Sequence, residues 1–254
     1  MITVVLLGGG NLALHLFDAL QKSKECSVLQ YYNRSIEKIA HLSGAVSITN
    51  NLQEIVSADL YIVAVSDDAI AKVAKNITKH NALIAHTSGS APLAVLPPHS
   101  RKASFYLLQT FTKGRALDFQ SVPICLETED EADFTLLKRL AMSLSRSVHH
   151  ISTPQRQALH LAAVFVNNFT NHLYLIGQEI CVAQGLSFDL LRPLIMETAK
   201  KIESLSPFEA QTGPAKRGDT KTLQRHQRQL QQKNRKEMYI LLSQSIENTH
   251  GKKL

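Results

Sequence analysis

Three glycines and an alanine near the start of the chain have the types and spacing of a phosphate-binding turn. The sequence GGGNLA places Gly8, Gly10 and Ala13 in a G-x-G-x-x-A pattern, between an apolar run and a helical pattern. Glycine permits the tight turn and lets the backbone approach a pyrophosphate, and the first helical amides, at Asn11 and Leu12, face that anion. The pattern predicts a dinucleotide site. No Gly-Lys-Ser/Thr follows, which excludes a Walker phosphate loop.

The end of the second predicted strand distinguishes between dinucleotides. Enzymes that use NAD carry an acid there that binds the ribose 2′-hydroxyl, whereas this chain reads YYNRS, with Asn33, Arg34 and Ser35. A guanidinium and a hydroxyl would bind the 2′-phosphate that a carboxylate would repel. We therefore predict NADP(H) as the cofactor rather than NAD or S-adenosylmethionine. The alternative is that Arg34 is only a surface residue on an exposed turn.

Two further loops follow predicted strands, at the edge where doubly wound sheets bind ligands. In AVSDDAI, the backbone at Val65 and Ser66 is expected to pass near the ribose and pyrophosphate. In HTSGS, His86 and Ser88 are expected to line the nicotinamide and substrate pocket, with plain helix capping as the alternative. A serine hydrolase is not indicated, because the G-x-S-x-G nucleophile elbow is absent.

The first half of the chain alternates strand and helix patterns, which predicts a parallel sheet with helices on both faces. The class is α/β, with a doubly wound Rossmann domain over residues 1–152. The predicted strands are 3–7, 28–32, 45–48, 60–65, 82–85, 103–108, 122–126 and 147–151. The predicted helices are 11–22, 35–41, 67–76 and 132–144.

The second half has only helical patterns, so residues 153–254 are predicted to form an all-helical domain that binds substrate and forms a homodimer. Ser152-Thr153-Pro154 is a strong helix start, and the helix is expected to continue to Gln184, before Gly185. It is apolar on more than one side, which favours burial against its own domain and a second subunit. Further helices are predicted at 188–203, 220–232 and 237–247.

One narrow stripe of the long helix is polar. His160, Asn167, Asn171 and Gln178 fall on it at about 100° per residue. Polar groups inside an apolar helix need partners or a wet cleft. We expect the stripe to line an active site, with His160 and Asn167 as catalytic residues and Asn171 as a substrate ligand. The alternative is that these side chains bridge helices in the core or in a dimer interface.

Composition is typical of an ordinary globular protein, with 44% hydrophobic and 19% charged residues among 254. Three dispersed cysteines show no metal-ligand spacing, so we expect no metal site, no disulfide and a cytoplasmic location. No apolar stretch is long enough for a membrane helix. The net charge of +7 lies in residues 211–254, with 10 Lys/Arg against 3 Asp/Glu. No aromatic residues lie between these basic ones, which favours a solvated helix face over nucleic-acid binding.

The chain resembles a bacterial family that joins a Rossmann domain to a helical domain of unknown function. The motifs that carry the resemblance, in order, are GGGNLA, YYNRS, AVSDDAI, HTSGS, QTF, HLAAVFVNN and TGPAKRGD. Members are labelled NADP oxidoreductases of the deazaflavin-dependent type. The chain is also distantly similar to pyrroline-5-carboxylate reductase and ketopantoate reductase. The resemblance implies an NADP-binding fold, a 6-phosphogluconate-dehydrogenase-like helical dimerisation domain and a cleft between the two domains.

Two positions depart from these relatives. Tyr106-Leu107 stand where family members often have His-Pro before the QTF segment, and Ala163-Val164 stand where the hydroxyacid and ketopantoate branches carry a catalytic lysine. Proton transfer must therefore come from another group, with His160 and His86 the leading candidates. In TGPAKRGD, Arg217 could bind a substrate carboxylate in bidentate fashion.

These observations predict an NADP(H)-dependent oxidoreductase. We expect a hydride to pass between nicotinamide and a small carbonyl or imine compound, which could be anionic, in the cleft between the domains. The missing lysine supports the alternative, a non-catalytic NADP-binding sensor or interaction protein.

Overall fold

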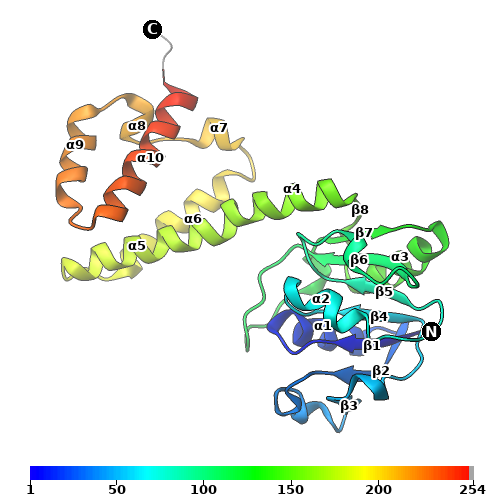
Figure 1. Ribbon diagram of the computed structural model, residues 1–254. Coiled ribbons are helices and arrows are strands. Elements are labelled where there is room, and N and C mark those ends of the chain that lie inside the picture. Colours follow the sequence, from blue (N-terminus) through cyan, green and yellow to red (C-terminus); the bar gives the residue numbers. More distant parts are fainter. Residues whose placement is uncertain (252–254) are drawn as a thin grey trace. The chain divides into compact units, whose positions relative to one another are not determined.

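The computed structural model describes residues 1–251, and their contacts divide the chain into two compact units, Met1–His172 and Leu173–Leu254 (Figure 1). The predicted domain boundary between residues 152 and 153 stays a prediction. The first unit extends further, and the start of the helix that follows residue 152 is held to the sheet by the ion pair of Arg156 with Glu127.

The first unit contains one eight-stranded sheet in the order β3-β2-β1-β4-β5-β6-β7-β8. The first six strands have the doubly wound order and are parallel, as predicted. β7 runs antiparallel to β6, and β8 is parallel to β7, so the sheet departs from the predicted parallel arrangement at the β6–β7 pair. The strands are β1 (Ile2–Leu7), β2 (Cys26–Tyr32), β3 (Ser47–Thr49), β4 (Leu60–Val63), β5 (Leu83–His86), β6 (Arg101–Leu107), β7 (Ile124–Thr128) and β8 (Val148–His150).

Helices cover both faces of this sheet. On one face, α1 (Asn11–Lys22) and α3 (Glu131–Leu144) pack on a core that includes Val4, Leu6 and Phe105. On the other face, α2 (Asp67–Ala74) packs on Val5, Leu7 and neighbouring strand residues. The helix predicted over 35–41 was wrong, because this short segment forms only the 3₁₀ turns η1 (Ile36–Lys38) and η2 (Ala40–Leu42).

The long helix predicted over 154–184 is present, but it is interrupted. It consists of α4 (Thr153–Ala163), a π-helical turn η6 (Val164–Phe169) and α5 (Thr170–Ala183). Ser152 and Gln155 form the capping box that starts α4. The wide turn holds the sequence VFVNNF, and the Thr170 hydroxyl donates to the Phe165 carbonyl five residues earlier, at 3.1 Å. Such turns occur frequently at functional sites.

In the second unit, the regular elements of the described residues are all helices. Besides the larger part of α5, they are η7 (Phe188–Leu191), α6 (Arg192–Lys201), α7 (Pro207–Ala210), α8 (Pro214–Arg217), α9 (Thr220–Gln229) and α10 (Lys233–His250). His226 on α9 bonds the Tyr239 hydroxyl on α10 at 2.9 Å, and Asp219 caps α9. The two four-residue helices α7 and α8 were not predicted. Within residues 1–251, no helix is long and apolar enough to cross a membrane.

Candidate functional site

The predicted phosphate-binding turn has the geometry that a pyrophosphate requires. Gly8 has a φ of +146°, and a Cβ placed on it would lie 2.0 Å from the Ala64 carbonyl oxygen. Gly10 is the N-cap of α1, has no capping side chain, and would meet no atom within 4 Å on gaining a Cβ. The first turn of α1 carries no acidic residue. Its amides therefore have neither a side-chain acceptor nor a repelling charge, so this turn fits the pyrophosphate of a dinucleotide.

The loop after β2 adjoins this turn. A Cβ placed on Gly9 would stand 2.5 Å from the Asn33 amide nitrogen, so Asn33 lies directly on the glycine turn. Its Nδ2 donates to the Ser35 carbonyl at 2.7 Å. Arg34 is exposed, and no carboxylate of residues 1–251 pairs with it. After β4, Val65 is half-buried and Ser66 starts α2 without making a side-chain cap. These predicted cofactor residues thus lie in loops that follow neighbouring parallel strands.

Strand alternation places a second group of side chains on one face of the sheet. Along β6 and β7, the residues of the α1–α3 core are Ala103, Phe105, Leu107, Ile124 and Leu126. The intervening residues of both strands point to the opposite face. They pair in register, Ser104 with Glu127 and Tyr106 with Cys125, and His86 pairs with Ser104 from β5. Over β5, β6 and β7, this face of the sheet therefore carries several polar side chains.

Arg156 on α4 joins this polar face to the helix. Its side chain is fully buried, and its Nη2 donates to the Glu127 carboxylate at 2.9 Å. Its Nη1 donates to the Ala91 carbonyl at 2.8 Å. Glu127 in turn accepts hydrogen bonds from the Thr153 amide and hydroxyl, at 2.6 and 2.8 Å. Arg156 and Glu127 therefore fix the start of α4 against β7 and the loop after β5.

His86 lies in this buried region rather than on a cavity wall. Its side chain is fully buried, its Nδ1 accepts from the Ser88 amide at 3.3 Å, and its Nε2 has no partner. Burial, with the charge of Arg156, lowers the pKa of His86 to about 4. His86 is therefore neutral at physiological pH. The Ser88 hydroxyl oxygen accepts from the Ser90 and Ala91 amides, at 3.0 and 2.9 Å, within a turn that precedes the short helix η4 (Leu93–Val95), so it caps no helix.

His160 and Tyr106 lie together on the wall of a cavity of about 290 Å³. The Tyr106 hydroxyl and His160 Nδ1 are 3.1 Å apart, and the two rings meet edge to face. A Cβ on Gly89 would stand 2.6 Å from the His160 ring, so the ring lies directly over Gly89. The cavity is lined by Tyr106, Leu108, Gln109, Thr110, Leu159, His160, Ala162, Ala163, Val166, Asn167 and Asn168.

The structure brings some of the predicted catalytic and substrate residues together and leaves others apart. His160 and Asn167 share the cavity, whereas His86, Ser88 and Asn171 do not line it. Arg217 ends α8 in the second unit and is exposed. The catalytic and substrate-binding roles of all these residues stay predictions. Sequence reasoning missed the partners of His160, although the alternation in RKASFYL already places Ser104 and Tyr106 on one face.

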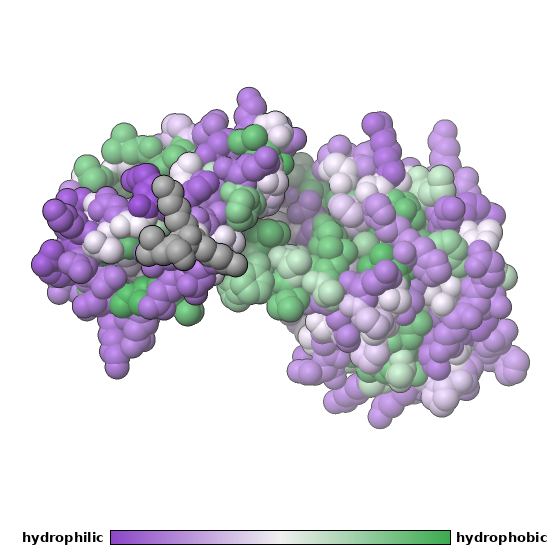
Figure 2. Space-filling view, turned by 90° about the horizontal axis from the view of Figure 1, so that it is seen from above, coloured by the Kyte–Doolittle hydropathy of each residue, from purple (hydrophilic) through white to green (hydrophobic). Residues whose placement is uncertain are grey.

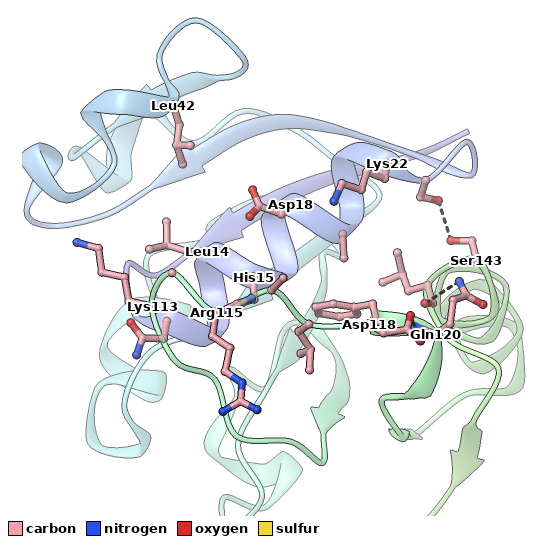
Figure 3. A pocket seen from close by; sticks show the side chains of 18 of the residues that line it. Leu14, His15, Asp18, Lys22, Leu42, Lys113, Arg115, Asp118, Gln120 and Ser143 are labelled. Atoms are coloured by element: carbon pink, nitrogen blue, oxygen red, sulfur yellow. Dashed lines mark hydrogen bonds between the residues drawn. The ribbon is translucent and has the colours of Figure 1, made fainter.

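A larger cavity of about 690 Å³ lies along the outer face of α1 (Figure 3). Three of its polar side chains are paired within the protein, because His15 bonds the Thr112 carbonyl, Gln120 bonds the Leu144 carbonyl and Ser23 bonds Ser143. Its charged side chains include both Lys113 and Asp118. The smaller cavity is the better candidate site, because it lies at the end of β6 and is lined by His160 and Asn167.

Comparisons with known proteins agree with this geometry. A family model described as "NADP oxidoreductase coenzyme F420-dependent" matches residues 3–89, and a model of a domain of unknown function, DUF2520, matches residues 122–246. A solved structure of a putative NADP oxidoreductase from Bacteroides fragilis is 39% identical, with a TM-score of 0.90. That alignment covers 97% of this chain and 98% of the other. No curated protein matches the chain.

Two more distant structures share the fold. An imine reductase from Myxococcus stipitatus in complex with NADP⁺ is 15% identical with a TM-score of 0.67, over 98% of this chain and 96% of that one. A pyrroline-5-carboxylate reductase from Coxiella burnetii is 16% identical with a TM-score of 0.55, over 97% and 96%. These likenesses confirm the predicted combination of a Rossmann fold with a helical part.

The match to the Bacteroides protein confirms the predicted enzyme class, an NADP-dependent oxidoreductase, and NADP(H) as its cofactor. The chain belongs to a family of putative NADP oxidoreductases, in which the region that matches the F420-dependent NADP oxidoreductase model is followed by the DUF2520 domain.

Proposed function

We propose that this oxidoreductase transfers a hydride between the nicotinamide of NADP(H) and a small carbonyl or imine compound bound in the His160 cavity. One observation carries the proposal. β1 and β6 are parallel strands of one sheet, so the glycine turn after β1 and Tyr106 at the end of β6 lie at the same edge. Ligands of doubly wound sheets bind at that edge. A cofactor held at the glycine turn would therefore extend along the edge on which the cavity lies.

The chain's own residues would bind the cofactor and supply a proton. The α1 amides would bind the pyrophosphate, and Arg34 with Ser35 would bind the 2′-phosphate. When bound, NADPH supplies the hydride. His160 would give a proton to the oxygen or nitrogen of the reduced compound, and Asn167 would hydrogen-bond that atom.

The cavity lining favours a small uncharged substrate. None of the residues that line it is Asp, Glu, Lys or Arg. Its polar groups are hydroxyls, amides and one imidazole, and the remainder are alanine, leucine and valine side chains. An unpaired carboxylate would lose its hydration there without gaining a cationic partner. A role for Arg217 in binding an anionic substrate stays a prediction.

Arg34→Ala is expected to weaken NADPH binding by about 10- to 150-fold, because a hydrogen bond to a charged group contributes about 1.5–3 kcal/mol. NADH affinity should be unchanged, since NADH lacks the 2′-phosphate. Arg34→Lys, which keeps the charge but loses the bidentate geometry, should show an intermediate loss. Calorimetric titration with both dinucleotides measures this. Equal affinity of the unmodified protein for NADPH and NADH would contradict the assignment of Arg34.

Turnover measurements test the proposed hydride transfer and the role of His160. The protein is mixed with NADPH and panels of carbonyls, imines and deazaflavin, and nicotinamide absorbance is followed. Turnover that His160→Ala abolishes would support the assigned proton donor. Turnover that survives His160→Ala would overturn that assignment, and tight NADPH binding without turnover would favour the non-catalytic alternative.

We also propose that the chain forms a homodimer through its helical half. A run of large apolar side chains on α4, η6 and α5 is exposed, and apolar surface is visible in green in Figure 2; the most exposed are Leu161, Phe165, Val166 and Val182. Contiguous apolar patches of this kind are characteristic of interaction surfaces. Sedimentation velocity should therefore give about twice the 28.2 kDa chain mass. A monomer at micromolar concentration would contradict the proposal.

A further inference from the structure

The His160 ring is held from two sides. Tyr106 contacts Nδ1 through its hydroxyl at 3.1 Å, and the backbone of Gly89 lies directly under the ring. By contrast, no protein group of residues 1–251 bonds to the other ring nitrogen, Nε2. The ring therefore has one nitrogen fixed within the protein and the other free of protein partners, on the wall of the cavity.

The Tyr106 hydroxyl decides which nitrogen carries the proton. Tyr106 is only 6% exposed, and burial raises the pKa of its hydroxyl, so the hydroxyl keeps its proton at neutral pH. Among residues 1–251 the hydroxyl has no other hydrogen-bond partner, so its proton is paired only when it donates to Nδ1, and Nδ1 is then the acceptor. In neutral imidazole, the single ring proton then lies on Nε2.

We propose that Tyr106 is a positioning residue that fixes His160 in the Nε2–H tautomer, with the glycine at position 89 leaving room for the ring. The proposal rests on the proposed function, in which His160 supplies a proton to the substrate. In the neutral ring, a fixed Nε2–H directs a hydrogen-bond donor at the substrate oxygen or nitrogen, whereas the Nδ1–H tautomer would direct that donor at Tyr106.

The test reads the tautomer directly and needs neither substrate nor cofactor. Protein with ¹⁵N-labelled histidine is studied by long-range ¹H–¹⁵N NMR at a pH where His160 is neutral, and His160→Gln identifies the signal. The expected spectrum of the unmodified protein shows a protonated Nε2 and an unprotonated Nδ1. In Tyr106→Phe, which keeps the ring but removes the hydroxyl, the two ¹⁵N shifts should move toward each other as both tautomers become populated.

Two further variants distinguish a specific effect of the Tyr106 hydroxyl on His160 from a general disturbance of the structure. Tyr61→Phe also removes a hydroxyl from a buried tyrosine, one that bonds the Val56 carbonyl and the Ala58 amide, and it should leave the His160 signal unchanged. Gly89→Ala places a methyl group against the His160 ring and should change the signal although Tyr106 is intact. Identical His160 shifts in the unmodified protein and in Tyr106→Phe would overturn the proposal. A fixed tautomer without turnover would instead contradict the proposed function alone.

Discussion

Gly8→Ala is expected to destabilise the protein by about 2–5 kcal/mol. The added methyl would stand 2.0 Å from the Ala64 carbonyl oxygen, and this oxygen cannot move without displacing the end of β4. The residue also has a φ of +146°, which alanine rarely adopts. Overpacking typically costs about 1–3 kcal/mol, and backbone strain of this kind costs a similar amount. Urea unfolding, followed by tyrosine fluorescence because the chain has no tryptophan, measures the loss.

Gly10→Ala is the matched control, two residues further along the same turn. A methyl there meets no protein atom within 4 Å, and the φ of −83° is ordinary for alanine. Its stability should therefore stay within about 0.5 kcal/mol of the unmodified protein. NADPH affinity should nevertheless fall about tenfold or more, because the methyl occupies space beside the amides that a pyrophosphate approaches. Unchanged NADPH affinity in Gly10→Ala would contradict the assignment of this turn.

Most strands of the sheet could be predicted from sequence, because each strand is indicated by a short run of neighbouring residues. An apolar run such as LYIVAV predicts a strand covered on both faces, and GGGNLA predicts the turn and helix that follow β1. The direction of β7 could not be predicted in this way, because strand direction depends on which neighbour the strand pairs with. The π-helical turn was missed for a related reason, since a wide turn keeps nearly the same apolar pattern as an α-helix.

The candidate site could be predicted from sequence less completely than the sheet. His160 and Asn167 could be selected because a polar stripe on an apolar helix is visible in sequence. Their setting could not, because Tyr106 contacts His160 from 54 positions away. Similarly, Arg156 reads in sequence as an ordinary exposed helical residue. Only the fold shows that it is buried and paired with Glu127. Contacts of this kind are determined by the tertiary structure and produce no periodic pattern in the sequence.

Glu127→Ala is expected to cost about 3–5 kcal/mol of stability, the range found when one partner of a buried ion pair is removed. The Arg156 side chain is fully buried, and Glu127 is its only carboxylate partner among residues 1–251. Removing Glu127 leaves a buried guanidinium uncompensated and takes the acceptor from the Thr153 amide and hydroxyl. Urea unfolding measures the loss. Hydrogen exchange should also show faster opening at the start of α4.

Glu129→Ala provides the comparison, because Glu129 forms the neighbouring ion pair, with Lys102, at 3.3 Å. The Glu129 side chain is 55% exposed, so water replaces its partner when the pair is broken. Exposed pairs contribute at most about 1 kcal/mol, and salt screens them further. Each variant therefore removes one glutamate carboxylate, at positions two residues apart, and the two glutamates differ chiefly in burial. Equal losses in both would show that the Arg156–Glu127 pair does not hold α4 against the sheet, and the ordered setting of His160 would then need another cause.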